Sequence, residues 1–567
     1  MPVQCVFQAT LQFELDGFAR ITYPLRQTPT TLYNWSGQTV HGEKFSARVD
    51  GYGGCVIGRF MGSSHTKMPA PKDGVRRTRP KTAQRDGQRW GHVVKSMPRQ
   101  YFLSLAFAVM MVVPAFAEQP DTQGESWFVD ATDITPNPDD ITNRLAEEAQ
   151  PKDSLLRTPQ FDTTRLSWKE FKDRLYEDYG FGFGIFYTTL YQKADASLVD
   201  AEGKSGADEA AGGILGIAGI WELVGRDTQH PGSLGFRLQQ RHKMSSIDPQ
   251  SLGPDIGSLW LTGSAFNEFE MSLIELYWEQ HIVKDRLAFR VGKNLPFVIH
   301  DYFSHKSPVT DFQDSNFTLN SSIAWTGFAM GAVGLVRPSP DIYILGGIYD
   351  AKGKQNRAGI DSFFNDGEHL ILTDIGWDPG FLDPSRKVRV GPIEVSNYHV
   401  TLWHRDSVEQ AMTPEGWGFT LFLEHRIGNF VPFFRYGYAD GIGGSNPALL
   451  DHMVAGGVAL EDVFGQDNDV IGIGASWGRR DLGTTVVPVS EPVIVSVGDE
   501  LIDLGEFTDL LDVDFGTVEQ YSVELFYRVQ VTQEFQVTPS VQFIIDPAFN
   551  LAEDNIAVLG VRGRAEF

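Results

Sequence analysis

The last thirteen residues, 555–567, read NIAVLGVRGRAEF, and their alternation decides the fold. Counting back from Phe567, every second residue is small or apolar: Ala565, Gly563, Val561, Leu559 and Ala557. The interleaved set begins with Glu566, Arg564, Arg562 and Gly560. A period of two is that of a β-strand with two unlike faces. The segment is therefore predicted to be a strand whose apolar face meets either a protein core or lipid.

The composition indicates a β protein rich in glycine and aromatic residues. The 567 residues include 58 glycines, 12% aromatic and 42% hydrophobic residues, and the mean hydropathy of −0.20 excludes a bundle of membrane helices. Residues 1–117 hold 15 Lys and Arg but only 6 Asp and Glu, which leaves the remainder near −34 and argues against a basic nucleic-acid footprint. Both cysteines, Cys5 and Cys55, precede residue 118, which suits an envelope protein that crosses an oxidising compartment.

Residues 97–117, MPRQYFLSLAFAVMMVVPAFA, have the features of a signal peptide: a basic Arg99, an apolar run and a small-x-small cleavage site ending at Ala117. A transmembrane anchor is the alternative, but the run is shorter than the ~20 residues of a span. We therefore interpret Met97 as the true start, Glu118 as the first mature residue, and 1–96 as spurious upstream translation or a disordered segment. A genuine cytoplasmic or pro-segment is the alternative for 1–96.

The mature chain divides into three parts. Residues 118–166 are acidic and proline-dotted and are expected to form a disordered leader. Residues 167–179 are predicted to form a short periplasmic helix, with Ser167 as N-cap and Gly180 as the stop. Period-two patterns then predict sixteen strands in 180–567, near residues 180, 211, 232, 271, 286, 322, 341, 368, 387, 415, 430, 453, 468, 517, 535 and 555.

The connections between these strands alternate in length. Short links such as HIVKD, RPSPD, RIGN, VFGQD and VTQE follow every second strand, whereas the links at 192–210, 243–270, 295–320 and 481–516 are long. Outer-membrane barrels have short periplasmic turns, long external loops and an even strand number. The sequence therefore predicts an all-β protein, a transmembrane antiparallel β-barrel of about 16 strands with a short N-terminal periplasmic helix.

The two faces of the predicted strands indicate which side meets lipid. Three strands show apolar residues alternating with a polar set. The apolar residues are Leu234, Phe236 and Leu238 in the first, Ile274, Leu276 and Trp278 in the second, and Tyr521, Val523, Leu525 and Tyr527 in the third. The alternating sets are Arg237, Gln239 and Arg241, then Glu275, Tyr277 and Glu279, then Ser522, Glu524, Phe526 and Arg528. A barrel of sixteen strands is too wide for side chains to fill. The polar sets are therefore expected to line a wet lumen, the apolar sets to meet lipid, and Phe567 to lie in the periplasmic aromatic girdle.

Five stretches in the same order carry a resemblance to a known family: ELYWEQHIVKDRLAFRVGK (275–293), FFNDGEHLILTDIGW (363–377), EGWGFTLFLEHRIGNFVPFFRYGYADG (415–441), GQDNDVIGIGASWG (465–478) and QYSVELFYRVQVTQEFQVTPSVQFIIDPAFN (520–550). From about Trp168 to Phe567 the chain resembles the carbohydrate-selective porins of the OprB type. The resemblance implies a sixteen-stranded outer-membrane channel for monosaccharides and small oligosaccharides, with Arg and Glu near the constriction. The acidic segment 481–516 does not match this pattern; an external loop that covers or narrows the mouth is one interpretation.

Strand parity selects the residues expected to line the channel and bind sugar. They are Arg237, Glu275, Glu279, Arg290, Glu424, Arg435, Glu524, Arg528, Arg562 and Arg564. The planar fork of arginine suits vicinal hydroxyls, and aromatic faces suit the apolar side of a pyranose. The alternative for each residue is an ordinary solvated lumen position or a pair that balances charge across the wall. The overall acidity is expected on the loops, where it favours cations or neutral solutes at the entrance.

We expect no enzyme activity, cofactor or metal site. GASWG around Ser476 lies in an alternating strand, where a nucleophile elbow needs a strand-to-helix turn. EGKS at Lys204 lacks the upstream glycine of a phosphate loop. No HExxH, CxxC or EF-hand loop occurs, and His281, His399 and His425 are interpreted as polar-face or interfacial residues.

These expectations define a location and a set of partners. The protein is predicted to be an outer-membrane porin of a Gram-negative bacterium that lets sugars diffuse passively. Its expected partners are outer-membrane lipid and lipopolysaccharide, sugars as permeants, and the barrel assembly machinery through Phe567, with no nucleic acid; it is a monomer or a homotrimer. The alternatives are a general diffusion porin without sugar preference and a surface glycan-binding β protein. Parity assembles no Ser/His or Asp/His constellation for a barrel enzyme.

Overall fold

The computed structural model describes residues 134–199, 203, 205–226, 228–379, 396–408, 413–440, 449–466, 468–482 and 516–567, together with the backbone of six strands outside these ranges. The chain divides into two compact units. One comprises Met1–Thr10, Ile21–Leu105 and Thr484–Phe515, and the other comprises Leu11–Arg20, Ala106–Gly483 and Gly516–Phe567. The predicted signal peptide at 97–117, the interpretation of 1–96 and the EGKS stretch at Lys204 lie outside the described residues.

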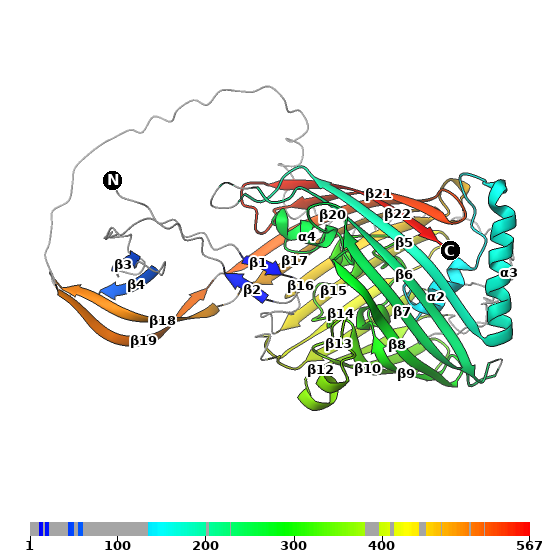
Figure 1. The fold of residues 1–567 in the computed structure, drawn as a ribbon, viewed down its shortest axis with the longest axis horizontal. Helices are drawn as coiled ribbons and strands as arrows, with labels where there is room; N and C mark the ends of the chain where they lie inside the picture. The colour runs from blue at the N-terminus through cyan, green and yellow to red at the C-terminus, as the bar shows by residue number, and fades with distance from the viewer. Residues whose placement is uncertain are drawn as a thin grey trace, which may run out of the picture. The chain divides into compact units, whose positions relative to one another are not determined.

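Sixteen antiparallel strands of the second unit close into one barrel, in which β22 pairs with β5 and β17 pairs with β20 (Figure 1). This confirms the predicted fold class. The strands are β5 Phe181–Ala194, β6 Glu209–Val224, β7 Gly232–Lys243, β8 Phe269–Val283, β9 Leu287–Asn294, β10 Ala329–Val336, β11 Ile342–Asp350, β12 His369–Trp377, β13 Asn397–Arg405, β14 Gly416–Glu424, β15 Phe430–Asp440, β16 His452–Glu461, β17 Val470–Asp481, β20 Thr517–Gln530, β21 Phe535–Ile545 and β22 Asn555–Glu566.

The barrel wall alternates as its sequence predicts. On β22, Leu559 and Val561 are 61% and 51% exposed, whereas Arg562 and Arg564, which have the opposite parity, are each 1% exposed. Outward aromatic residues gather near both ends of the strands, with Trp221 and Trp377 at one end and Trp417 at the other. This distribution is that of a barrel with an apolar outer band between two aromatic girdles.

The strand ends separate short turns from long loops. The links β8–β9, β10–β11, β14–β15, β16–β17 and β20–β21 lie at the end where β5 begins and β22 finishes. The longer connections β5–β6, β7–β8, β9–β10 and β17–β20 lie at the opposite end. The predicted alternation of link lengths is therefore confirmed. The connection at 378–396 is long although it lies at the short-turn end.

Two predicted strand positions are wrong or untested. The strand expected near 322 begins only at Ala329, because the apolar residues just before it belong to a buried loop inside the barrel. The position near 387 lies outside the described residues, and the corresponding strand, β13, begins at Asn397. Short apolar runs in a buried loop and in a strand look alike in sequence, since both alternate or cluster over a few residues.

One predicted orientation is wrong. The alternation predicts Ile274 on the outward face with Leu276 and Trp278, yet Ile274 is fully buried inside the wall. Arg237 pairs with Glu275 and Leu238 pairs with Leu273, so Ile274 is the extra residue of a β-bulge. A bulge reverses the facing of the residues on one side of it. Ile274 consequently packs with Phe269, Leu295 and Val298.

The N-terminal part of the described chain is helical over more residues than the sequence predicts. α2, Ile141–Glu148, lies in the stretch expected to be a disordered leader, and its Ile141 and Leu145 are buried against β6 and β8. α3, Asp162–Tyr179, begins five residues before the expected helix and has no side-chain N-cap. It ends as predicted at Gly180, which has a left-handed φ of 70°. Burial against the barrel orders α2, and its local composition does not reveal that contact.

The remaining elements are short. The second unit also contains α4 Pro249–Asp255, α5 Pro296–Ile299, α6 Ser315–Thr318, the single turns η2 Pro159–Phe161 and η6 Val463–Gly465, and the π-turn η3 Ser362–Asp366. Three separate hairpins pair β1 Leu11–Glu14 with β2 Phe18–Ile21, β3 Lys44–Val49 with β4 Cys55–Phe60, and β18 Thr484–Val497 with β19 Glu500–Asp514. The acidic segment expected to be an external loop thus forms the β18–β19 hairpin. No helix within the described ranges is both long and apolar enough to cross a bilayer.

Candidate functional site

Residues 295–328, the inner loop, connect β9 to β10 and lie within the barrel, where nearly all their side chains are buried. Phe303, Phe312 and Phe317 of this loop form one apolar cluster with inward residues of β14–β17 and β20. Phe303 lies 4.5 Å from Phe433, and Phe312 lies 4.8 Å from Phe526, between ring centroids. This side of the lumen is therefore packed with protein, whereas the sequence predicts a wall that lines water.

Inward carboxylates of two strands bind the backbone of the inner loop. Glu524 of β20 accepts hydrogen bonds from the amides of Gln313 and Asp314, each at 2.9 Å. Glu424 of β14 accepts from the amide of Ser304 at 3.1 Å and from its hydroxyl at 2.5 Å. Because a buried loop must find partners for its backbone groups, these two carboxylates hold it inside the barrel.

Inward arginines complete the attachment of the inner loop. Arg435 pairs with Asp301 at 2.9 Å and donates to the carbonyl oxygens of α6. Burial alone would raise the pKa of Asp301, but Arg435, His399 and Lys306 together outweigh burial and hold that pKa well below its ordinary value. Arg562 donates to the carbonyl oxygen of Asp311 at 2.8 Å, and Arg528 pairs with the Asp311 carboxylate at 3.0 Å.

A second insert, the N-terminal segment at 134–152, is bound by the opposite part of the wall. Arg290 of β9 pairs with Asp140 at 2.8 Å and with Glu279 at 2.7 Å, and none of the three side chains is more than 3% exposed. Arg237 pairs with Glu275 at 2.7 Å and donates to the carbonyl oxygen of Asp139 at 2.5 Å. Asp140 also caps α2.

The last strand supplies a further attachment for this N-terminal segment. Glu566 pairs with Lys152 at 2.5 Å and with Arg144 at 3.7 Å. Arg564 donates to Glu566 and lies 3.9 Å from Glu148. Burial and the neighbouring Glu566 raise the pKa of Glu148 to about 7. The N-terminal segment is therefore attached to the barrel through a buried network of acidic and basic side chains.

All ten residues selected by strand parity lie on the inward face of the wall, and their contacts divide them into two groups. Five hold the inner loop: Glu424, Arg435, Glu524, Arg528 and Arg562. Five hold the N-terminal segment or pair with residues that do: Arg237, Glu275, Glu279, Arg290 and Arg564. Of the ten, Arg237 and Arg564 line a cavity in the lumen.

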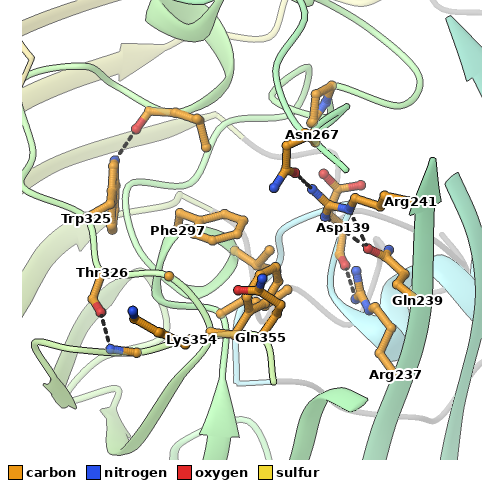
Figure 2. Close-up of a pocket in the computed structure, with 18 of the residues that line it drawn as sticks. Asp139, Arg237, Gln239, Arg241, Asn267, Phe297, Trp325, Thr326, Lys354 and Gln355 are labelled. Atoms are coloured by element: carbon orange, nitrogen blue, oxygen red, sulfur yellow. Dashed lines mark hydrogen bonds between the residues drawn. The ribbon is translucent and has the colours of Figure 1, made fainter. Parts of the chain in front are cut away.

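That cavity has a volume of about 930 Å³ and lies between the inner loop, the N-terminal segment and β7. Figure 2 shows Trp325 and Phe297 of the inner loop facing Arg237, Gln239 and Arg241 of β7. Trp325 donates its indole N–H to the carbonyl oxygen of Asn320 at 3.2 Å. The ring of Phe297 packs edge-on against the indole, with 6.5 Å between the ring centroids. The cavity thus joins aromatic faces to a row of polar donors and acceptors.

Several cavity residues are not among those selected from the sequence. Gln239 and Arg241 belong to the polar set expected to line the lumen but not to the ten candidate sugar contacts. Nothing in the sequence marks Asn267, Phe297 or Trp325 as lumen residues. Asn267 lies in the connection between β7 and β8, and Phe297 and Trp325 lie in the inner loop. Strand parity applies to neither segment. Only the return of both connections into the barrel brings them to the cavity.

The cavity wall carries an excess of positive charge. It contains two acidic residues, Asp139 and Asp366, and nine basic ones: Arg144, Arg237, Arg241, Lys306, Lys352, Lys354, Arg357, Arg405 and Arg564. Asp139 is paired with Arg144, and Asp366 with Lys352. Arg237 and Arg564 are paired with Glu275 and Glu566, which do not line the cavity. The remaining basic side chains leave an excess of positive charge at the cavity, in a chain whose net charge is −25.

The other candidate chemistries have ordinary structural roles. Ser476 lies within β17 and its hydroxyl contacts that of Ser522 at 2.9 Å, which is no nucleophile elbow. His281 bonds to Glu279 at 2.9 Å, and His399 lies 3.6 Å from Asp301. His425 lies on the turn after β14 and contacts Tyr398. In the described part of the chain no three His, Cys, Asp or Glu side chains form a group that could hold a metal ion.

Comparisons with known proteins place this geometry in a family. Among solved structures, the chain is similar to the high-pH structure of Pseudomonas putida OprB (14% identity, 73% of this chain and 99% of that chain, TM-score 0.49) and to trimeric OmpT of Vibrio cholerae (9% identity, 68% and 99%, TM-score 0.37). Curated proteins yield no match. The family model described as "Carbohydrate-selective porin, OprB family" matches residues 250–567, more than half of the chain. The chain therefore belongs to the OprB family of carbohydrate-selective porins, non-enzymatic β-barrel channels of the outer membrane.

Proposed function

We propose that the protein lets monosaccharides and small oligosaccharides diffuse passively through its lumen, and that the cavity beside Trp325 selects them. The single observation that carries this proposal is the pairing of Trp325 and Phe297 with Gln239, Arg241 and Asn267 around one cavity. A sugar has an apolar ring face and a polar edge, and these two kinds of wall match them. The volume of about 930 Å³ lies within the range of about 300–1,000 Å³ that small-molecule pockets occupy.

The ten inward charged residues contribute to this function in two ways. Arg237 and Arg564 reach the cavity and are the members of the set that we propose as sugar contacts. The other eight position the inner loop and the N-terminal segment, which narrow the lumen. Selectivity then depends on the width left between these inserts and on the donors and acceptors that replace the hydration water of the sugar.

Ion conductance through the purified, reconstituted protein tests the proposal. Glucose or a small maltooligosaccharide is expected to reduce the current at millimolar concentrations, because a bound sugar obstructs the cavity. Trp325→Ala should raise the half-blocking concentration about threefold to tenfold, the effect of losing an aromatic contact of roughly 0.5–1.5 kcal/mol. Trp417→Ala, on the outward face, is the matched control and should leave sugar block unchanged.

Two outcomes would contradict the proposal. If sugars leave the current of a conducting channel unchanged, the protein is a general diffusion porin without sugar preference. If Trp325→Ala and the control variant respond alike, the binding site lies elsewhere in the lumen.

The same proposal includes contacts with the membrane and the assembly machinery. Exposed apolar residues such as Leu525, Leu559 and Val561 support contact of the outer wall with lipid and lipopolysaccharide. Phe567 is 52% exposed and its amide donates to the carbonyl oxygen of Ile185 at 2.8 Å, which leaves the ring accessible to a barrel-assembly factor. Deletion of Phe567 should reduce the amount of protein in the outer membrane, measured by fractionation and heat-modifiable migration.

A further inference from the structure

Arg241 is a buried cation on the wall of the cavity beside Trp325. It lies on β7, four residues from Arg237 on the same inward face, and only 8% of its surface is exposed. Its guanidinium lies 4.8 Å from the ring centroid of Phe269 and 5.8 Å from that of Phe328. The aromatic rings hold the planar group in place at the edge of the cavity.

No carboxylate pairs with this guanidinium among the described residues. Its acceptors are two neutral amide oxygens: Gln239 Oε1, at 3.1 Å from Nε and 2.9 Å from Nη2, and Asn267 Oδ1, at 2.7 Å from Nη1 (Figure 2). The other two basic residues of its strand, Arg237 and Lys243, are already matched by Glu275 at 2.7 Å and by Glu268 at 3.2 Å.

Three other buried inward arginines of the barrel have counter-ions. Arg237 has Glu275, Arg290 has Asp140, and Arg435 has Asp301. A buried charge without a partner costs several kcal/mol in principle, and proteins rarely retain one without a use. Arg562 bonds instead to the backbone carbonyl oxygens of Pro308 and Asp311, but it does not line the cavity. Arg241 differs from these four arginines because it has only side-chain amide acceptors and borders the cavity.

The amides orient the guanidinium without neutralising it. The three hydrogen bonds account for Nε–H and for one N–H on each terminal nitrogen. One N–H on Nη1 and one on Nη2 remain without an acceptor in the described structure. Two N–H groups of one guanidinium match the two oxygens of a carboxylate, and such paired bonds are among the strongest in proteins.

We propose that the cavity takes a sugar that carries a carboxylate, such as a hexuronate, and that this carboxylate pairs with Arg241. The inference rests on the proposed sugar-selective function and names the class of sugar. Across the cavity, exposed Lys354 and Arg357 of the β11–β12 loop add positive charge on the path from the loop side. This cationic wall opposes the expectation, drawn from net charge, that the entrance favours cations or neutral solutes.

A comparison of two sugars of the same size tests the assignment. Glucose and glucuronate are titrated separately against the current of the reconstituted full-length channel at constant ionic strength. The half-blocking concentration of glucuronate is expected to be about tenfold below that of glucose, since a charge-assisted pair is worth roughly one such factor. Arg241→Gln should reduce this ratio to about one, because it removes the charge that pairs with the carboxylate. The ratio compares the two sugars in the same variant, so a general weakening of sugar block does not change it. Arg241→Lys should keep part of the preference, because it keeps the charge but loses the fork.

The control variant is Arg286→Gln, which removes the same charge from an exposed turn at the opposite end of the barrel. Its glucuronate preference should equal that of the native channel, and heat-modifiable migration verifies that every variant is folded. Equal block by both sugars in the native channel would overturn the inference and leave the sugar function intact. Loss of the preference in Arg286→Gln would also overturn it, by tracing the effect to overall charge. Absence of block by either sugar would contradict the proposed function itself.

Discussion

Single inward residues of this barrel act mainly as attachments for protein that enters the lumen. Glu524 illustrates this role, because its carboxylate accepts from two consecutive amides of the inner loop while remaining fully buried. Arg435 does the same from the other side by pairing with Asp301. Strand parity identifies both residues as inward, but their partners lie more than one hundred residues away in the chain.

The Arg435–Asp301 pair is expected to be essential for the inner loop. Arg435→Ala leaves the buried Asp301 carboxylate without its main partner, which should destabilise the folded barrel by about 3–5 kcal/mol. Denaturant unfolding in detergent micelles measures this change. Arg286→Ala, at an exposed turn, should change stability by less than about 0.5 kcal/mol. A similar small change for Arg435→Ala would show that the loop does not depend on the pair.

His305 should make the stability of the barrel depend on alkaline pH. Burial alone would lower its pKa, but hydrogen bonds to Asp311 and Glu461, at 3.4 and 3.1 Å, raise the pKa to about 9. These carboxylates also pair with Arg528 and Arg426. Because the folded pKa exceeds the unfolded value of about 6.5, the stabilisation of roughly 3 kcal/mol is complete below about pH 6.5 and is lost as the pH rises through 9.

Unfolding free energies at pH 6 and pH 10 check this prediction. Native protein should exceed His305→Gln in stability at pH 6, and the difference should shrink at pH 10. A difference that is the same at both pH values would show that His305 carries no extra proton in the folded state.

At the scale of elements, two inserts occupy part of the barrel interior. The inner loop packs its phenylalanines on β14–β17 and β20, while α2 packs on β6 and β8. The sequence predicts neither insert, since 118–166 is expected to be disordered and the region near 322 to be a strand. In the structure, both inserts form buried ion pairs with inward strand residues.

Removal of the N-terminal segment should therefore widen the channel. Deletion of residues 134–152 takes away α2 and the lysine and arginine that pair with Glu566. Single-channel conductance in the same salt should rise, and block by sugar should weaken because one wall of the cavity is lost. A barrel lacking only 155–160, which leaves α2 and these pairs intact, is the comparison. Unchanged conductance after the deletion would contradict a narrowing role for this segment.

At the scale of the whole molecule, the outward face must tolerate hydrocarbon. Val561 lies in the middle of β22 and is 51% exposed, whereas Leu551, in the β21–β22 connection, is 94% exposed. Val561→Arg should destabilise the barrel by about 2–4 kcal/mol in a bilayer, because it places a charge near the midplane. Leu551→Arg should have little effect, since loops meet water. Folding titrations into vesicles distinguish the two, and equal effects would contradict the lipid-facing assignment of the apolar face.

The sequence by itself determines the barrel, its strand number and which side of each strand faces the lumen. Period-two alternation and the lengths of the links are local properties, and they identify inward Arg562 and outward Val561 without reference to the rest of the chain. A β-bulge defeats the same reasoning at Ile274, because one inserted residue changes the facing without changing the composition.

Only the tertiary structure decides what fills the lumen. Glu524 meets Asp314, and Arg290 meets Asp140, across separations of 210 and 150 residues. Trp325 and Arg241 reach one cavity from a loop and a strand. No local pattern specifies these contacts, because they form through burial and charge pairing between segments that become neighbours after the barrel has closed. The lack of a carboxylate beside Arg241 is visible for the same reason only in the folded chain.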